Sequence, residues 1–391
     1  MFLFLMIFVG FSGNLFGLPL LGVNYWYFEP LTPSQKELVV RAFQDLHLDI
    51  VRIGGLWYDA HGIDESVLKS FFEFCEALDA TPLVQVPFNR YDVDKARKFV
   101  KRVKTLWPRE IWWSIGNEMD IYTDLWKNRV FSWIEPMSMH EAFNRFDEFL
   151  KLLEDSGAST IFAPDYSWKW RPWWKRHDWI SPFLERFSNR ISILAVHRYP
   201  FDEAGSIKQI MDDVEAFTEE MSRLHRVFPQ HPISLTEVNL TWNWEYKGRF
   251  DGQSYWAGLW FIAIYGRAAY LGLHSVLFWS AVNDKTLSLV TMKGSQIELH
   301  PTYYVLKFWS DVEGELTKHE LSKTLDYYVF ESHDSRIVVI VNKSPKEMIV
   351  DVDESISLPV RPFTAVKLAI DRKSGTIRRK EIFSQQNLLQ R

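Results

Sequence analysis

The sequence predicts an α/β protein: a (β/α)8 barrel, or TIM barrel, followed by a small antiparallel β domain. From Leu18 onward, short apolar runs of strand length alternate eight times with segments whose apolar residues recur at helical spacing. The strand-like runs are apolar throughout, which is typical of parallel strands buried on both faces. After residue 312 the helical spacing stops and only short β-like runs follow. A doubly wound open sheet is the alternative, but the eight units and the lack of a glycine-rich dinucleotide loop after the first strand argue against it.

Length and composition bound the classes of function. The chain has 391 residues, 47% of them apolar, which is enough for one large domain and one small one. Its formal net charge of -5 argues against nucleic acid or an anionic membrane surface as a partner. The 18 tryptophans exceed ordinary usage, and such rings serve both as core packing and as stacking platforms for sugars. The single cysteine, Cys75, lies in a helical apolar stripe and is expected to be a core thiol.

Residues 1–17 are predicted to be a signal peptide. An apolar run at 2–9, short for a membrane span, is followed by small and polar residues, as in a secretory signal. No Lys or Arg precedes the run, so a buried N-terminal segment is the alternative. We therefore expect a secreted or periplasmic protein if the segment is a signal peptide, and otherwise a cytoplasmic one. No other stretch resembles a membrane span.

Residues 18–312 are assigned to the barrel. Its first helix has a clear start signal, with Thr32 as N-cap, Pro33 at the first helical position and Gln35 at the third. The helix expected at 255–270 is almost wholly apolar, so other parts of the protein must cover it. The eight strands are expected at 20–24, 48–53, 83–86, 111–115, 160–163, 191–196, 233–236 and 275–279, and the last helix is expected to start at Pro301.

Residues 313–371 are predicted to form a small β-sandwich-like domain. Four short β-like runs, at 327–330, 337–341, 348–352 and 365–368, are separated by turn-forming segments. The polar and mildly basic segment 372–391 is expected to be a frayed tail.

Polar and aromatic side chains stand where five of the predicted strands end. Barrel enzymes carry their sites at the C-terminal ends of the strands. Each residue alone could be structural, for example a buried ion-pair partner or a helix cap. Five sets at one end of the barrel favour a functional site. The sets are Arg52 after the second strand, Asn117 and Glu118 after the fourth, His197 and Tyr199 after the sixth, Glu237 after the seventh and Trp279 after the eighth.

Two of these residues, Glu118 and Glu237, suggest a chemistry. Glycoside hydrolysis with retention of configuration needs one carboxylic acid to protonate the leaving oxygen and one carboxylate to attack the anomeric carbon. Both glutamates follow apolar strand-like runs, so both are expected at the same end of the barrel. We expect their carboxyl groups to lie about 5 to 5.5 Å apart, the separation of the retaining mechanism.

The ordered set resembles glycoside hydrolase clan A, the (β/α)8 retaining glycosidases with an Asn-Glu acid/base after strand four and a Glu nucleophile after strand seven. Gly116-Asn117-Glu118 is similar to the acid/base motif, and Glu237 matches the nucleophile by position. The resemblance covers about residues 18–310. The segment 52–55 and the β domain are similar to the β-xylosidase, iduronidase and heparanase-like families. The first strand, which ends at Asn24, is instead similar to the broad cellulase and mannanase family, so the family within the clan is left open.

The resemblance also implies roles for the neighbouring residues. Arg52, His197 and Tyr199 would surround the nucleophile, and Arg52 with the Tyr199 hydroxyl would keep it ionised. Asn117 would hydrogen-bond the sugar 2-hydroxyl, a contact that strengthens in the transition state. Trp279 would form the floor of the sugar subsite, and Asn24 is counted with these substrate-binding residues.

No cofactor and no metal ion are expected, because the histidines show no metal-ligand spacing. The histidines considered are His61, His177, His197 and His274.

The loop 168–176, after the fifth strand, interleaves tryptophans with lysines and arginines. We predict that at least one of its rings, with Trp170 as the candidate, lines the cleft and binds a sugar, for example an anionic one. The alternative is a surface hairpin whose rings pack on the barrel while the cations face water. Further candidate platforms are Trp57, Tyr58, Tyr122, Trp126, Trp242 and Trp244.

The predicted function is therefore a retaining β-glycoside hydrolase that acts on a β-linked oligo- or polysaccharide. The alternatives are a non-catalytic carbohydrate-binding barrel that has kept an aromatic cleft, and a transglycosylase that uses the same residues. Both glutamates together with Asn117, Arg52 and Tyr199 favour catalysis.

Overall fold

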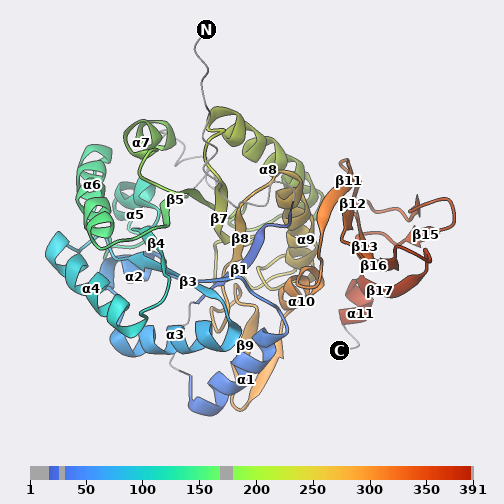
Figure 1. Ribbon diagram of the computed structural model, residues 1–391, viewed down its shortest axis with the longest axis horizontal. Helices are drawn as coiled ribbons and strands as arrows, with labels where there is room; N and C mark the ends of the chain where they lie inside the picture. Colours follow the sequence, from blue (N-terminus) through green and yellow to red (C-terminus); the bar gives the residue numbers. More distant parts are fainter. Residues whose placement is uncertain (1–16, 26–30, 168–178, 389–391) are drawn as a thin grey trace, which may run out of the picture.

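The computed structural model describes residues 17–25, 31–167 and 179–388 of the chain. Eight parallel strands close into a barrel in sequence order, with β1 paired to both β2 and β8 (Figure 1). This confirms the predicted barrel. The strands are β1 (Leu20–Asn24), β2 (Ile50–Ile53), β3 (Thr81–Val86), β4 (Trp112–Ile115), β5 (Ile161–Tyr166), β6 (Ile193–Arg198), β7 (Ile233–Val238) and β8 (Ser275–Phe278).

Helices cover the outside of the barrel (Figure 1). The predicted capping box is present: the Thr32 hydroxyl accepts a hydrogen bond from the Gln35 backbone N–H, and the Gln35 side chain accepts one from the Thr32 N–H. The short helices after β2 and β4 were not predicted by the spacing. The helices are α1 (Pro33–Gln44), α2 (Leu56–His61), α3 (Glu65–Leu78), α4 (Val93–Leu106), η1 (Met119–Ile121), α5 (Tyr122–Lys127), α6 (Met139–Asp155), α7 (Ile180–Phe187), α8 (Ile207–Val227), α9 (Tyr255–Tyr270) and α10 (Pro301–Trp309).

A small antiparallel β domain follows the barrel, as predicted. A five-stranded sheet, in the order β11-β12-β13-β16-β17, and a two-stranded sheet, β14-β15, share one apolar core. A separate hairpin, β9-β10, lies between β8 and α10 in the sequence. The strands are β9 (Val290–Lys293), β10 (Gln296–Leu299), β11 (Glu315–Leu321), β12 (Leu325–Glu331), β13 (Ser335–Asn342), β14 (Met348–Asp351), β15 (Ser357–Val360), β16 (Thr364–Asp371) and β17 (Ile377–Phe383), and α11 (Gln385–Leu388) comes last.

The expectation of a frayed tail over 372–391 is wrong for the middle of that segment. β17 pairs antiparallel with β16 at the edge of the sheet. Its last residue, Phe383, is buried and stacks on Tyr255 of α9, with 5.2 Å between ring centroids. The charged residues before Phe383 remain in water along the edge strand, so the segment lacks the apolar alternation that would have revealed it.

Helix α9 is apolar on all sides because it lies between the barrel and the β domain (Figure 1). It contacts α8 and α10 on the barrel side, and β11 and β16 on the other. A Cβ atom at Gly266 would lie 2.7 Å from the Tyr328 ring, so this glycine permits the close approach of the two domains. The predicted need for cover over 255–270 is thus met by the β domain.

A buried ion cluster also joins the two domains. The Lys343 Nζ atom lies 2.9 Å from Glu215 Oε1 on α8 and 2.9 Å from Asp326 Oδ1 on β12. Arg267 of α9 pairs with the same two carboxylates, at 2.6 Å each. Each charge therefore has a partner, which buried charges require.

The predicted signal peptide lies almost entirely outside the described residues, so the structure says nothing of it. Within the described ranges, no helix has both the length and the apolar character that a membrane crossing needs.

Candidate active site

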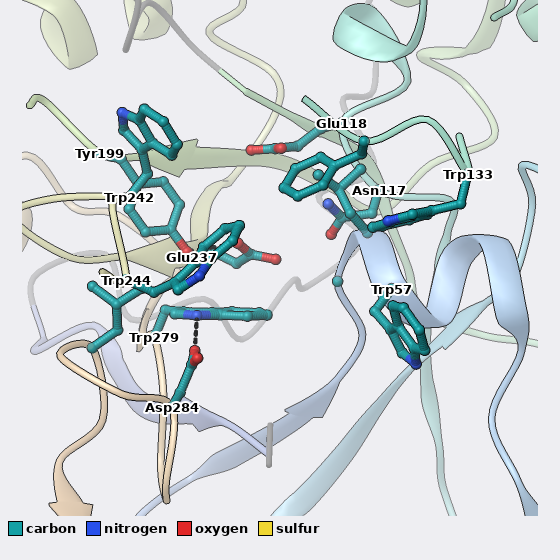
Figure 2. Close-up of a pocket in the computed structure, with 14 residues that line it drawn as sticks. Trp57, Asn117, Glu118, Trp133, Tyr199, Glu237, Trp242, Trp244, Trp279 and Asp284 are labelled. Carbon is teal, nitrogen blue, oxygen red and sulfur yellow. Dashed lines mark hydrogen bonds between the residues drawn. The ribbon is translucent and has the colours of Figure 1, made fainter. Parts of the chain in front are cut away.

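A pocket of about 260 Å³ opens at the C-terminal ends of the barrel strands, and both glutamates line it (Figure 2). Figure 2 shows the Glu118 and Glu237 side chains reaching toward each other from opposite walls, with aromatic rings around them. The described lining residues are Gly55, Leu56, Trp57, Asn117, Glu118, Phe131, Trp133, Tyr199, Glu237, Trp242, Trp244, Trp279, Asp284 and Leu287.

The backbone at Glu118 is held in an uncommon conformation. Gly116 turns the chain at φ 68° just after β4, and Glu118 itself has φ 51°. A non-glycine residue in this left-handed region is strained and is commonly found at functional sites. Its N–H donates to the Asp165 carbonyl at 3.0 Å, which fixes the turn. A Cβ at residue 116 would come within 3.1 Å of Phe88, so a glycine suits this position in two ways.

The Glu237 carboxylate is held from two sides. Oε1 accepts a hydrogen bond from Arg52 Nη1 at 2.8 Å, and Oε2 accepts one from the Tyr199 hydroxyl at 2.7 Å. The arrangement therefore fixes the orientation of the Glu237 carboxyl group, whose side chain is nearly buried.

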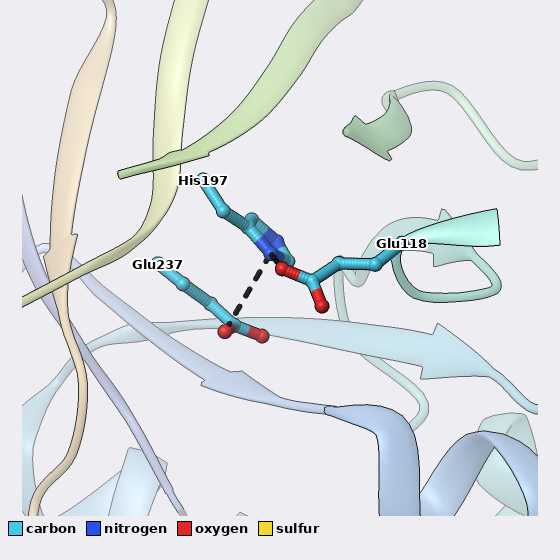
Figure 3. Close-up of side chains that lie close together, drawn as sticks. All are labelled: Glu118, His197 and Glu237. Atoms are coloured by element: carbon cyan, nitrogen blue, oxygen red, sulfur yellow. Dashed lines mark hydrogen bonds and ion pairs between the residues drawn. The ribbon is translucent and has the colours of Figure 1, made fainter. Parts of the chain in front are cut away.

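His197 lies between the two glutamates (Figure 3). Its Nδ1 atom is 2.9 Å from Glu118 Oε1 and 3.6 Å from Glu237 Oε2. One carboxylate oxygen of each glutamate and one imidazole nitrogen all lie within 4.8 Å of one another. This proximity is shorter than the wide separation of about 6.5 to 9.5 Å found in inverting glycosidases, and it suits the retaining arrangement.

Arg52, completely buried on β2, ties the floor of the site together. Besides Glu237, its guanidinium donates to the side-chain oxygens of Asn24 and Asn117, at 2.8 Å each, and to Asp165 Oδ2 at 3.0 Å. Arginine suits this position because its planar fork can serve several acceptors at once. Through it, Asn117 and Glu237 take fixed positions relative to each other.

Electrostatics set the protonation states around His197. Burial alone would lower the pKa of this imidazole, but the charge of Glu237 and the contacts with Asp165 and Glu118 raise it to about 10. At neutral pH the ring is therefore an imidazolium. Burial opposes ionisation of Asp165, yet Arg52 and His197 lower its pKa below the ordinary value. The site thus contains a buried cluster of alternating charges.

Glu118 differs electrostatically from Glu237. Burial raises the pKa of Glu118, and the charge of Glu237 adds to this, while His197 acts in the opposite direction. Burial has the largest influence, so Glu118 holds its proton at higher pH than an ordinary glutamate. Two carboxyl groups with different environments are the usual arrangement of an acid paired with a nucleophile.

Glu118, His197 and Glu237 form the one group in the described part of the chain whose ligand atoms are close enough to hold a metal ion. The charge state argues against that use. To bind a metal, His197 would have to release the proton that its raised pKa, about 10, favours. Both oxygens of Glu237 are also already hydrogen-bonded.

One wall of the pocket is the indole ring of Trp279, held by a carboxylate. Trp279 Nε1 donates to Asp284 Oδ2 at 2.7 Å (Figure 2). Both residues are buried, and burial raises the pKa of Asp284 to about 7. Trp279 follows β8 and is joined to Ser280 by a cis peptide bond.

A chain of aromatic rings, contributed by the segments after three of the strands, also borders the pocket. Trp57 of α2 meets Trp133 edge-on at 5.5 Å between centroids, Trp133 contacts Phe131 at 5.0 Å, and Phe131 stacks on Trp244 at 5.7 Å. These rings join the segments after β2, β4 and β7 around the pocket. Their faces suit the apolar faces of sugar rings.

The structure brings most of the predicted site residues together, in two groups. Glu118, Glu237, Asn117, Tyr199 and Trp279 line the pocket. Arg52 and His197 are not among the lining residues but contact lining side chains, and Asn24 in turn contacts Arg52. Asn24 is 1% exposed and donates to the Thr236 carbonyl at 2.9 Å, so its position is that of a support for the site rather than of a sugar contact.

The predicted aromatic platforms divide in the same way. Trp57, Trp242 and Trp244 line the pocket, whereas Tyr58, Tyr122 and Trp126 do not. The Tyr122 hydroxyl is buried against Asp59, and Trp126 is 49% exposed on α5. Trp170 and most of the loop 168–176 lie outside the described residues, so the prediction for that loop stays a prediction.

Sequence reasoning missed Asp165, Asp284, Phe131 and Trp133. The sequence predicts that the fifth strand ends at residue 163, which would leave Asp165 outside it. In the structure β5 instead continues to Tyr166 and includes Asp165. Asp284 lies several residues beyond a strand end, where no pattern marks it. Phe131 and Trp133 stand in a loop, and only their position shows that they reach the pocket.

The sequence matches no known family profile, and no curated protein matches it. The fold, however, is similar to solved glycoside hydrolases. The GH51 α-L-arabinofuranosidase from Thermotoga petrophila RKU-1 is 14% identical, with a TM-score of 0.65 over 90% of this chain and 95% of that one. A GH30 endoxylanase from Clostridium papyrosolvens C71 is 12% identical, with a TM-score of 0.59 over 88% and 94%. A 4-O-α-L-rhamnosyl-β-D-glucuronidase from Fusarium oxysporum 12S is 13% identical, with a TM-score of 0.61 over 86% and 80%.

At these identities the likeness shows the fold alone. The coverage includes the barrel and extends well beyond it, so the β domain belongs to the shared architecture. The resemblance to clan A is thereby confirmed at the level of fold. The similar structures differ in family and in the sugars that their names state, so they single out no family for this chain.

Proposed function

We propose that the protein is a retaining β-glycoside hydrolase that cleaves a β-linked oligo- or polysaccharide by double displacement, with Glu118 as acid/base and Glu237 as nucleophile. One observation carries the proposal: the two carboxyl groups face each other across an aromatic pocket, with oxygens within 4.8 Å. The likeness in fold to solved glycosidases is consistent with it.

In the first step, Glu237 attacks the anomeric carbon and Glu118 protonates the departing oxygen. Arg52 and Tyr199 hold the Glu237 carboxyl group in one orientation, which reduces the entropy that the attack would otherwise cost. Burial, which raises the pKa of Glu118, keeps the proton available for the leaving group. The products are a covalent glycosyl ester on Glu237 and a free alcohol.

In the second step, Glu118, now ionised, accepts a proton from water, and the water oxygen attacks the anomeric carbon from the face that the leaving group vacated. Glu237 departs as a carboxylate. Two inversions at one carbon restore the original configuration. The imidazolium of His197, 2.9 Å from Glu118 and 3.6 Å from Glu237, offsets negative charge as the proton changes hands.

Asn117 is in position to contact the sugar beside the reacting carbon. It lines the pocket, and its side-chain oxygen accepts a hydrogen bond from Arg52 at 2.8 Å. Its amide N–H2 group donates to no residue in the described part of the chain, so it can face a sugar hydroxyl. Trp279 supplies a flat apolar surface under the ring.

Trapping of the covalent intermediate tests the proposal. The wild-type protein is first screened on 4-nitrophenyl β-glycosides of mono- and disaccharides, and the matching 2-deoxy-2-fluoro glycosyl fluoride is then added. We expect time-dependent inactivation and a mass increase of one fluorosugar on the peptide that contains Glu237. The Glu237→Gln variant should take up no label. A label on another residue, or products of inverted configuration by NMR, would refute the assignment.

The same products separate hydrolysis from transglycosylation, because a transglycosylase returns longer oligosaccharides at high substrate concentration. Export remains a further proposal, supported by the apolar run at 2–9. N-terminal sequencing of the protein recovered from the producing cells and from their medium would test it.

A further inference from the structure

Asp284 is a buried carboxylate in the pocket that the double-displacement scheme does not use. It stands in the loop after β8, is 3% exposed, and belongs to the pocket lining together with both glutamates. Its Oδ2 atom accepts the Trp279 indole N–H at 2.7 Å, with the Ser280 hydroxyl further away at 3.4 Å. No described residue donates a hydrogen bond to the other oxygen, Oδ1.

Asp284 Oδ1 is not among the buried polar atoms that lack a partner, so it is open to the pocket and takes its hydrogen bond from water or from a ligand. The surrounding lining offers few donors. Around the pocket the described lining side chains are mostly apolar rings, with Glu118 and Glu237 as the other acids and no lysine, arginine or histidine among them. A ligand that enters the pocket is therefore the natural source of the donor.

The fixed indole places that ligand. A sugar stacked on Trp279 would lie on the ring whose N–H donates to Asp284, so a hydroxyl at that edge of the sugar would be the group nearest to the carboxylate. Because burial raises the pKa of Asp284 to about 7, the group is ionised at alkaline pH, where a hydrogen bond from a hydroxyl to the carboxylate is charge-assisted, short and directional.

We propose that Asp284 is a specificity-determining residue, which accepts a hydrogen bond from one hydroxyl of the sugar that lies on Trp279. The inference rests on the proposed function and adds the substrate class to it: an uncharged sugar that presents a hydroxyl at this edge. A sugar with a carboxylate at the same place would meet three acids and is disfavoured.

The test uses wild type and Asp284→Asn on the 4-nitrophenyl glycoside that the wild type cleaves best, and on its monodeoxy analogues. The asparagine keeps an acceptor for the Trp279 N–H, so the platform stays in place. Because hydrogen bonds to charged groups are strong, we expect kcat/KM on the parent glycoside to fall about 10- to 100-fold. The analogue that lacks the hydroxyl bound by Asp284 should have the same low kcat/KM with both proteins. With every other analogue, the loss of kcat/KM caused by the missing hydroxyl and the loss caused by Asp284→Asn should multiply.

The control is Asp251→Asn, the same change at a half-buried aspartate outside the pocket lining, which should leave the whole series as in the wild type. Two results would overturn the inference while leaving the glycosidase intact. One is that Asp284→Asn lowers kcat/KM by the same factor on the parent and on every deoxy analogue, and the other is that it leaves kcat/KM on the parent unchanged. A wild-type protein that is inert on every glycoside would instead refute the proposed function, and the inference with it.

Discussion

Replacing His197 by glutamine should remove a part of the stability that depends on pH. The folded protein raises the pKa of this histidine from 6.5 to about 10. A group whose pKa is raised on folding stabilises the protein fully below its unfolded value, and this contribution is lost as the pH rises through the folded value. At about 1.36 kcal/mol per pH unit, the shift corresponds to at most about 5 kcal/mol.

The measurement is urea unfolding of wild type and His197→Gln, followed by tryptophan fluorescence at pH values from about 6 to about 10. The stability difference between the two proteins should be largest at the acid end of this window and should shrink toward the alkaline end. His274→Gln is the matched control. Burial lowers the pKa of His274 to about 4, so this ring is neutral in the folded protein throughout the window. Because the unfolded ring still titrates near pH 6.5, the stability lost in His274→Gln should rise by less than about 1 kcal/mol between about pH 6 and pH 7.5, the opposite direction from His197→Gln, and should be constant at higher pH.

A stability difference for His197→Gln that does not change with pH would show that the ring is not an imidazolium. The buried charge cluster around Glu118, Glu237 and Asp165 would then need another source of positive charge. It would also remove the argument against a metal ion at this site.

Three further predictions concern the pocket and the domain junction. Trp133→Ala should raise KM for an oligosaccharide about 5- to 150-fold, since aromatic contacts of this kind contribute about 1–3 kcal/mol. Trp126→Ala alters an exposed ring outside the pocket lining and should leave KM unchanged, and equal effects of the two changes would remove the aromatic rings from the binding argument. Lys343→Ala should destabilise the protein by about 3–5 kcal/mol in urea unfolding, because Glu215 and Asp326 then share Arg267 as their one cationic partner in the cluster and an excess negative charge is left at the junction. Exposed Lys346→Ala should change little, and a small loss in both variants would mean that the cluster does not hold the domains together. Dialysis against a metal chelator should leave kcat/KM unchanged, and activity that is lost and then restored by a divalent metal would contradict the assigned charge state.

The barrel was predictable because its signals are local and repeated. Each strand is an apolar run, and the almost wholly apolar sequence at 255–270 predicts a helix that is buried on all sides. The edge strand β17 was not predictable from the sequence. A strand at a sheet edge keeps charged residues in water, and within β17 only Phe383, at its end, is buried. β17 forms a strand because it pairs with β16, and a local sequence pattern does not reveal that pairing.

The site residues also differ in how far the sequence predicts their positions. Glu118 and Glu237 stand directly at strand ends, so the barrel geometry alone brings them together. Asp284 and Trp133 stand in loops, and their places are set by contacts with Trp279 and Trp57. The Arg52 guanidinium lies behind the Glu237 carboxylate rather than in the pocket. The sequence places Arg52 at the end of a strand, and a long side chain at that place could reach either position.

The distinct roles of the two glutamates are the central claim, and azide rescue tests them most directly. Glu118→Ala should still form the covalent intermediate from an aryl glycoside with a good leaving group, and azide, which needs no base, should release it as the β-glycosyl azide. Glu237→Ala cannot form that intermediate, so azide should attack from the opposite face and give the α-glycosyl azide. NMR of the two products decides the matter: opposite anomers are the predicted result, and the same anomer from both variants, or full activity of either on a polysaccharide, would contradict the account.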